Sequence, residues 1–219
     1  ARACGHDHEL ALELWDTGFH EARILAGMVE DPTRITREQA DAWVRDIDSW
    51  DVCDQLCLNL LDRTPFAWEK AVAWSREEPE FVKRAGFALM AVLAVHARDA
   101  ADEAFLPFLE RIREEASDDR NFVKKAVNWA LRQIGKRNAR LNRDAVATAE
   151  AISGLDTRTA RWNATNALRE LMSEEVVRRY GYFDPKKVGL LMRKAMSGRA
   201  VANKDNMAFV GILSTQILH

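Results

Sequence analysis

The sequence predicts an all-α protein in which pairs of helices repeat along the chain. Only 10 glycines and 5 prolines interrupt its 219 residues, and long stretches consist of Ala, Leu, Glu, Arg and Lys, which favour helices. Apolar residues recur at spacings of three and four, as they do along one face of a helix. Similar segments also recur along the chain, which is typical of repeat proteins.

The apolar spacing predicts ten helices joined by short polar loops. Thr64 followed by Pro65, and Pro79 ahead of the next apolar run, offer a cap residue and prolines suited to helix starts. Within each range the apolar residues share one face, which would be buried against a neighbouring helix. In order, the predicted helices cover residues 8–15, 18–30, 36–47, 50–62, 65–76, 80–97, 102–115, 120–136, 142–152 and 157–171.

The repeats are visible in two similar segments, FVKRAGFALMAVL at 81–93 and FVKKAVNWALRQI at 122–134. HEARILAGMV at 20–29 and RTARWNATNALREL at 158–171 are weaker copies. The interval between the first two copies is about twice a helical-pair repeat, which predicts one more equivalent helix near Asp54. Stacked helix pairs form a curved α-solenoid whose inner helices line one concave surface. We therefore expect the functional residues on that surface.

Composition narrows the class of protein. A chain with 47% hydrophobic and 30% charged residues is typical of one ordinary globular domain. Cys4, Cys53 and Cys57 have neither disulfide-framework nor zinc-site spacing, so we expect no metal and a reducing, cytoplasmic environment. We find no leader-like start and no apolar run of about 18 residues, and expect no membrane association. The net charge of −2 does not by itself indicate nucleic-acid binding.

The segment DSWDVCD, residues 48–54, places an acid in an apolar helix stripe. Trp50 lies four residues before Asp54, so the indole and the carboxylate share one face. Asp51 is expected in the first turn, where a carboxylate favours the helix N-terminus. The other helical neighbours of Asp54 are apolar: Cys57, Leu58 and Leu61. Asp54 is therefore a candidate functional residue.

Trp129 lies on a basic face of its predicted helix. The core stripe of that helix contains Val123, Val127, Ala130, Leu131 and Ile134. The helical neighbours of Trp129 are instead Lys125, Arg132, Gln133 and Lys136. Between Arg120 and Arg143 there are eight Lys or Arg and no acid, a pattern that suits a phosphate backbone with a base or sugar nearby. The alternative is a solvated helix with favourable cations near its C-terminal end.

Arg84 shares a helix stripe with Phe81, Ala88 and Ala91, away from the predicted core stripe. Small neighbours leave room for a ligand to approach the guanidinium. An ion pair with a carboxylate such as Asp54 is the alternative, and the two interpretations are compatible.

Three motifs together carry a family resemblance: DSWDVCD, EFVKRAGFALMAVLAV and NFVKKAVNWALRQIGKRN. Over residues 8–172 the sequence resembles the DNA alkylation repair family, the AlkD-type glycosylases built from HEAT-like repeats. The resemblance implies excision of cationic N-alkylated purines, such as 3-methyladenine and 7-methylguanine, from duplex DNA. It assigns the catalytic aspartate to Asp54, the two active-site tryptophans to Trp50 and Trp129, and the arginine to Arg84.

The chemistry is compatible with these assignments. A base alkylated on a ring nitrogen is already a cationic leaving group, and the carboxylate of Asp54 would stabilise the positive charge left on the deoxyribose. Indole faces attract cations by about 0.5–2 kcal/mol each, so Trp50 and Trp129 are expected to hold the sugar and the base. Arg84 is expected to bind the phosphate beside the lesion. The resemblance further implies that the base stays largely stacked, so that no deep pocket is required.

The expected partner is duplex DNA carrying alkylated bases, bound by a monomer without a cofactor. Further DNA contacts are expected from six basic residues: Lys124, Lys125, Arg132, Lys136, Arg137 and Arg140. Trp162, among arginines on the last predicted helix, would extend this surface. Two alternatives remain at this point, a family member that binds DNA without excision and a helical scaffold that binds a polypeptide.

The resemblance also predicts the domain organisation. A glycosylase domain is expected at 1–172, without additional N-terminal helices that relatives carry. Residues 173–219 have a different texture and are expected to form a C-terminal helical extension of unknown role.

Overall fold

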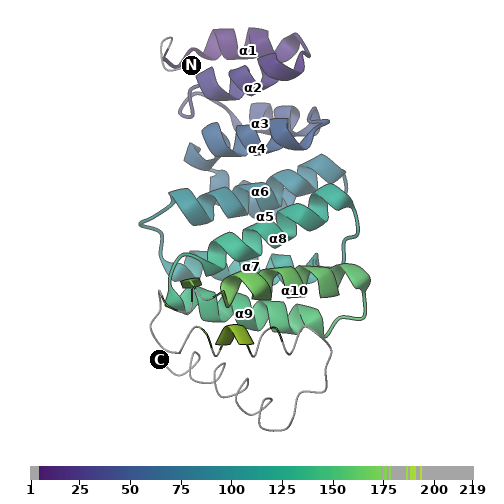
Figure 1. Ribbon diagram of the computed structural model, residues 1–219. Helices are drawn as coiled ribbons and strands as arrows, with labels where there is room; N and C mark the ends of the chain where they lie inside the picture. The colour runs from purple at the N-terminus through teal and green to yellow at the C-terminus, as the bar shows by residue number, and fades with distance from the viewer. Residues whose placement is uncertain are drawn as a thin grey trace. The chain divides into compact units, whose positions relative to one another are not determined.

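The chain is helical throughout the part that can be described. A computed structural model describes residues 5–173, with 175, 176, 178, 186, 188–190 and 193. These residues contain helices and no strand, which confirms the all-α class. The α-helices are α1 (His8–Asp16), α2 (His20–Val29), α3 (Arg37–Arg45), α4 (Trp50–Asn59), α5 (Ala67–Trp74), α6 (Glu80–His96), α7 (Leu106–Glu114), α8 (Asn121–Gly135), α9 (Ala139–Ser153) and α10 (Arg158–Leu171) (Figure 1). Within the same part of the chain, no helix has the length and apolar character needed to cross a membrane.

All ten predicted helices are present, and their boundaries differ in places. Short 3-10 turns, η1 (Leu61–Arg63) and η2 (Asp102–Phe105), occupy the end of the fourth predicted range and the start of the seventh. The predicted start of α5 at Thr64 and Pro65 is wrong, because α5 begins at Ala67. The Thr64 hydroxyl instead donates to the carbonyl oxygen of Leu61 at 2.8 Å and stabilises the end of η1. Pro79 does occupy the N-cap position of α6, as predicted.

The chain divides into two compact units. Among the described residues, the first comprises 5–100 and 118–130, and the second comprises 101–117 with those from 131 onward. In the first unit α1 packs on α2, α5 packs on α6, and α2, α4 and α6 are successive neighbours (Figure 1). The similar segments lie on α2, α6, α8 and α10. The additional equivalent helix predicted near Asp54 is α4, so the repeat falls on every second helix.

Helix α6 forms the centre of the first unit. All thirteen of its residues from Val82 to Ala94 are buried, including two cationic residues, Lys83 and Arg84. Its contact with α5 is close at Gly86, where an added Cβ would lie 2.4 Å from the Ser75 nitrogen. This site requires glycine for steric reasons, because a side chain would force the two helices apart.

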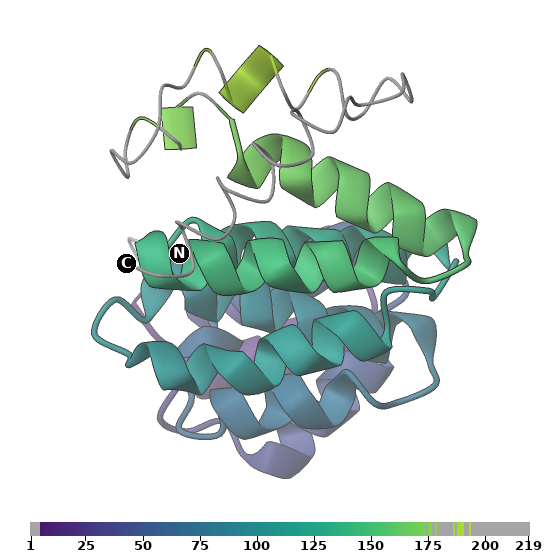
Figure 2. The ribbon, with the colours of Figure 1, turned by 90° about the horizontal axis from the view of Figure 1, so that it is seen from below.

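In the second unit, α9 packs on both α7 and α10 (Figure 2). Buried amides connect its segments: Asn142 Nδ2 donates to the carbonyl oxygens of Gly135 and Leu171 at 3.0 and 3.2 Å, and Asn163 Nδ2 donates to that of Ala116 at 2.9 Å. The predicted domain boundary at 172 stays a prediction, because most of 173–219 lies outside the described residues.

Candidate functional site

Helix α4 places Trp50 and Asp54 one turn apart at its N-terminal end. The buried residues of α4 are Val52, Cys53, Leu56 and Cys57. The Cys57 thiol donates to the Ala85 carbonyl oxygen on α6 at 3.6 Å, and Cys53 Sγ lies 3.9 Å from the Phe81 carbonyl oxygen. These contacts fix the rotation of α4, so that Asp54 lies beside Arg84 on α6.

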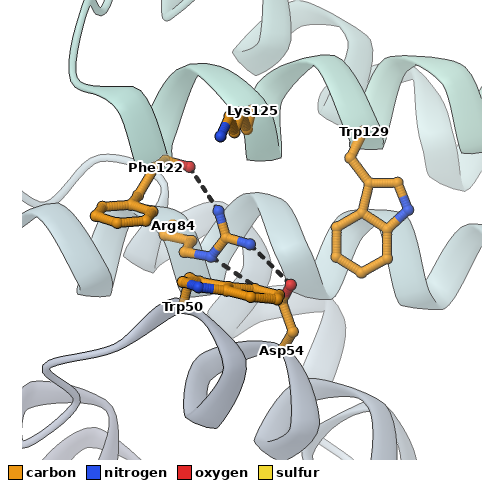
Figure 3. A pocket seen from close by; sticks show the side chains of 6 residues that line it. All are labelled: Trp50, Asp54, Arg84, Phe122, Lys125 and Trp129. Carbon is orange, nitrogen blue, oxygen red and sulfur yellow. Dashed lines mark hydrogen bonds and ion pairs between the residues drawn. The ribbon is translucent and has the colours of Figure 1, made fainter.

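The side chains of Arg84 and Asp54 form a two-point ion pair. Arg84 Nε and Nη2 donate to the two carboxylate oxygens of Asp54 at 3.1 and 2.7 Å, and Nη1 donates to the carbonyl oxygen of Phe122 at 2.7 Å (Figure 3). Arg84 is only 5% exposed, whereas the Asp54 side chain is 20% exposed. The guanidinium therefore joins α4 to the start of α8, and the carboxylate keeps partial access to solvent.

Burial raises the pKa of the Asp54 carboxyl above its ordinary value. The charge and hydrogen bonds of Arg84 act in the opposite direction, while the nearby carboxylate of Asp51 raises this pKa further. Burial has the largest effect because it penalises the charged form directly. The site thus holds a carboxylate that is poorly solvated and held in position by one cation.

Helix α8 contributes the other wall of the site through Phe122, Lys125 and Trp129. Positions three and four apart share a helix face, so these three side chains point the same way. The opposite stripe is buried, and the predicted core residues of α8 are all confirmed: Val123, Val127, Ala130, Leu131 and Ile134.

The N-terminal end of α8 is fastened to the start of α6. The Phe122 backbone N–H donates to Glu80 Oε1 at 3.3 Å, and Arg120 Nη1 donates to the Glu78 carbonyl oxygen at 2.6 Å. Asp118 accepts from Arg120 and lies 3.7 Å from the ammonium of the buried Lys83. This network holds the Phe122 carbonyl where Arg84 can donate to it.

The two walls enclose a cavity of about 300 Å³, lined by Trp50, Asp54, Arg84, Phe122, Lys125 and Trp129. All six residues belong to the first unit. Trp50 remains 52% exposed although it lines the cavity. Figure 3 shows the guanidinium of Arg84 between the indole of Trp50 and helix α8, with the carboxylate of Asp54 beside it and the indole of Trp129 extending from α8. The cavity therefore combines an aromatic lining with one fixed ion pair and one exposed ammonium.

The four residues assigned a catalytic role from the sequence, Trp50, Asp54, Arg84 and Trp129, come together in this cavity. The ion pair predicted between Arg84 and Asp54 is confirmed, and phosphate binding by Arg84 stays a prediction. Sequence reasoning missed Phe122. Its position seven residues before Trp129 was the available signal, because residues seven apart share a helix face.

The six predicted DNA-binding residues differ in their position and in their contacts. Lys125 is exposed and lines the cavity, and Lys124 is half-buried. Four others lie in the second unit: Arg132 and Lys136 pair with Glu170, Arg140 pairs with Glu103 at 2.6 Å, and Arg137 lies over the Phe105 ring at 4.3 Å. Their contact with DNA stays a prediction, and only Lys125 adjoins the cavity. Within the described ranges, no group of three His, Cys, Asp or Glu residues is arranged to hold a metal ion.

Comparisons with known proteins agree with this architecture. One solved structure aligns with a TM-score of 0.62 and 22% sequence identity, over 69% of this chain and 65% of its own. Its protein is described as part of "a new family of proteins related to the HEAT-like repeat DNA glycosylases with affinity for branched DNA structures". This chain thus spans slightly less than two thirds of that protein. The alignment shows that the fold is the HEAT-like repeat fold.

The family follows from the sequence. The model of the family described as "DNA alkylation repair enzyme" matches residues 2–171, and this chain belongs to that family. No curated protein matches the sequence significantly.

Proposed function

We propose that this protein is a DNA glycosylase that hydrolyses the N-glycosidic bond of cationic N-alkylated purines in duplex DNA, such as 3-methyladenine and 7-methylguanine. The observation that carries the proposal is the carboxylate of Asp54, ion-paired with Arg84 in a cavity lined by the indoles of Trp50 and Trp129. Membership of the DNA alkylation repair family also supports the proposal. A scaffold for polypeptides has no need of this combination.

The cavity offers what the reaction requires. An alkylated purine leaves as a neutral base, and the positive charge that develops on the deoxyribose needs a fixed negative group nearby. Asp54 supplies this group and orients the attacking water. Arg84 holds the carboxylate by two hydrogen bonds, so little reorganisation is needed during the reaction. Arg84 is thus primarily a positioning residue for Asp54.

The aromatic residues and the cavity size suit a substrate that stays stacked. The faces of Trp50 and Trp129 attract the cationic base and the developing sugar cation. A volume of about 300 Å³ is at the lower limit of the range of about 300–1,000 Å³ for pockets that enclose a ligand. We infer that the cavity holds the deoxyribose and one edge of the base and does not enclose a fully flipped nucleotide.

A second candidate function is DNA binding without excision. The solved relative with affinity for branched DNA favours it, and so does the neutralisation of Asp54 by Arg84. One experiment separates the two functions. The protein is incubated with duplex DNA carrying 7-methylguanine, and abasic sites are then measured by alkaline strand cleavage. Abasic sites in excess of the spontaneous level support the glycosylase, whereas binding without cleavage supports the alternative. Cytoplasmic location and a monomeric state stay predictions.

Lys125 provides a test of phosphate contact at the cavity. If its ammonium meets one phosphate, Lys125→Ala should weaken binding. The negative slope of log K against log salt should become less steep by about 0.9. Fluorescence anisotropy at several salt concentrations measures this slope. Arg76→Ala, which removes another exposed cation of the first unit, is the matched control. Equal slopes for Lys125→Ala and the parent would contradict the contact.

The raised pKa of Asp54 predicts an acid limb in the excision rate. The reaction needs the ionised carboxylate, so the single-turnover rate should fall as pH is lowered through a pKa above that of an ordinary aspartate. The contribution of Asp54 to stability should change in the opposite direction, whereas carboxylates with lowered pKa values, such as Asp41 and Asp118, lose their contribution as pH falls. A carboxyl group whose pKa is raised by folding favours the folded state below its unfolded pKa, and this contribution is lost as pH rises through the folded pKa.

Rate measurements in the acid range where circular dichroism shows folded protein check the first statement, and the pH dependence of the melting temperature in the parent and in Asp54→Asn checks the second. An acid limb at the ordinary aspartate pKa in folded protein would refute the prediction.

A further inference from the structure

The side chains of Phe19 and Trp50 have unusual exposure for large aromatic residues. Phe19 is 73% exposed and Trp50 is 52% exposed. Trp50 belongs to the candidate site, whereas Phe19 has no part in the function proposed so far. Large apolar side chains on a protein surface often mark a contact surface.

A bridge between α2 and α4 brings these two aromatics to the same edge of the first unit. His20 Nε2 lies 2.8 Å from Asp51 Oδ2. Phe19 directly precedes His20, and Trp50 directly precedes Asp51. Each aromatic is therefore one residue away from the bridge.

The segment before α4 is tied to α2 and α1 at a second point. Arg23 Nη1 donates to the Asp46 carbonyl oxygen at 2.9 Å, and Trp15 Nε1 donates to Asp46 Oδ2 at 3.2 Å. Together with the His20–Asp51 bridge, these bonds fix the start of α4 relative to α2. The spacing between Phe19 and Trp50 is thus set by the fold.

The turn that presents Phe19 is itself well ordered by hydrogen bonds. The Gly18 N–H donates to the Trp15 carbonyl oxygen, and the Phe19 N–H donates to Thr17 Oγ1. Gly18 adopts φ +71°, a conformation that side chains disfavour. Phe19 occupies the N-cap of α2 and forms no capping bond, although Ser, Thr, Asp or Asn would stabilise the helix there. Phe19 therefore does not give α2 the stabilisation that a capping side chain would give.

From these observations we propose that Phe19 is a second aromatic contact for DNA, an apolar wedge that opens the base step beside the nucleotide at the Trp50 cavity and stacks on the neighbouring base. This inference rests on the proposed binding of DNA and extends the same site along the strand. A phenylalanine suits the role, because every base has a π-face and stacking tolerates any sequence. The His20–Asp51 bridge positions the two aromatics together.

The test uses a fluorescein-labelled duplex with a tetrahydrofuran abasic analogue, and a second duplex with 2-aminopurine beside that analogue. Phe19→Ala should raise the Kd about tenfold, which is within the range for loss of one aromatic–base stack. Phe19→Trp should bind as the parent does, because it restores a stacking surface. His20→Ala should weaken binding in the same direction, since the bridge is lost.

Val95→Ala is the matched control, because Val95 is 47% exposed at the far end of α6 in the same unit. It should leave the Kd unchanged. The parent should change the 2-aminopurine emission on binding, and Phe19→Ala should not. A Kd and an emission change like those of the parent in Phe19→Ala would overturn this inference alone, as would an equal loss in Val95→Ala. No binding by the parent would overturn both the inference and the proposed function.

Discussion

Replacing Asp54 by asparagine should reduce single-turnover release of 7-methylguanine by about a hundredfold or more, because one preorganised electrostatic group contributes about 3 kcal/mol to a transition state. Asparagine keeps the shape of the side chain and its hydrogen-bonding oxygen. It removes the negative charge opposite the developing sugar cation. DNA affinity should be equal or higher, since one repulsion of phosphate disappears.

The ion pair makes a stability effect unavoidable in this variant. Asp54→Asn keeps one acceptor oxygen for Arg84 but places its amide N–H groups against the second guanidinium donor, so one of the two hydrogen bonds is lost and the melting temperature should fall as well. Excision must therefore be measured well below that temperature. Asp41→Asn is the matched control, because Asp41 pairs with Lys70 at 2.7 Å and accepts from Trp74 Nε1 at 2.8 Å away from the cavity. It should lower stability and leave excision near the parental rate. Near-parental release by folded Asp54→Asn would remove Asp54 from the mechanism.

Much of the fold could be predicted because most helices bury one stripe. Amphipathic spacing is local, and it located helices such as α8, whose core stripe was predicted residue by residue. Helix α6 differs, because neighbouring helices cover it on nearly all sides and bury even Lys83 and Arg84. The spacing of a single apolar stripe could not predict the burial of these two cations. The start of α5 was also mislocated. The Thr64 hydroxyl donates to the Leu61 carbonyl oxygen in η1, and this partner depends on the tertiary turn.

The site was predictable where one helix carries the signal and less so where partners come from different helices. Trp50 with Asp54, and Trp129 on its basic face, are visible from spacing within single helices. The acceptor of Arg84 Nη1 is a backbone carbonyl 38 residues away, and no side-chain pattern encodes such a partner. The basic run after Arg120 shows that the sequence also does not reveal which charges are paired. Its charges appear as one face in the sequence, yet Arg132, Lys136 and Arg140 are engaged by carboxylates of the second unit.

The largest expected effect on stability comes from Arg84. Arg84→Met keeps much of the side-chain volume but removes all three donors at once. Asp54 becomes a poorly solvated carboxylate without a partner, and the Phe122 carbonyl oxygen loses its donor. Breaking a buried ion pair from one side costs about 3–5 kcal/mol, and the partial exposure of Asp54 places this case near the lower end. At about 2–4 °C per kcal/mol for a chain of this size, the melting temperature should fall by roughly 6–12 °C.

Arg37→Met tests whether this loss is specific to the buried pair. Arg37 pairs with Glu69 at 2.6 Å, but both side chains are exposed, so its removal should change the melting temperature little. The double variant Asp54→Asn with Arg84→Met should be more stable than Arg84→Met alone, because it no longer holds a poorly solvated carboxylate without its partner. Thermal melts of the parent, both single variants and the double variant give the coupling between the two residues.

The same variants separate the positioning role of Arg84 from its structural role. If Arg84 only stabilises the fold, Arg84→Met protein that is still folded should excise at the parental rate with the same acid limb. If Arg84 also holds Asp54 ionised and oriented, the excision rate should fall, and the acid limb should move to higher pH because the interaction that lowers the Asp54 pKa is gone. Coupling near zero in the melts, together with an unshifted acid limb, would contradict the role of the Arg84–Asp54 pair as the centre of this site.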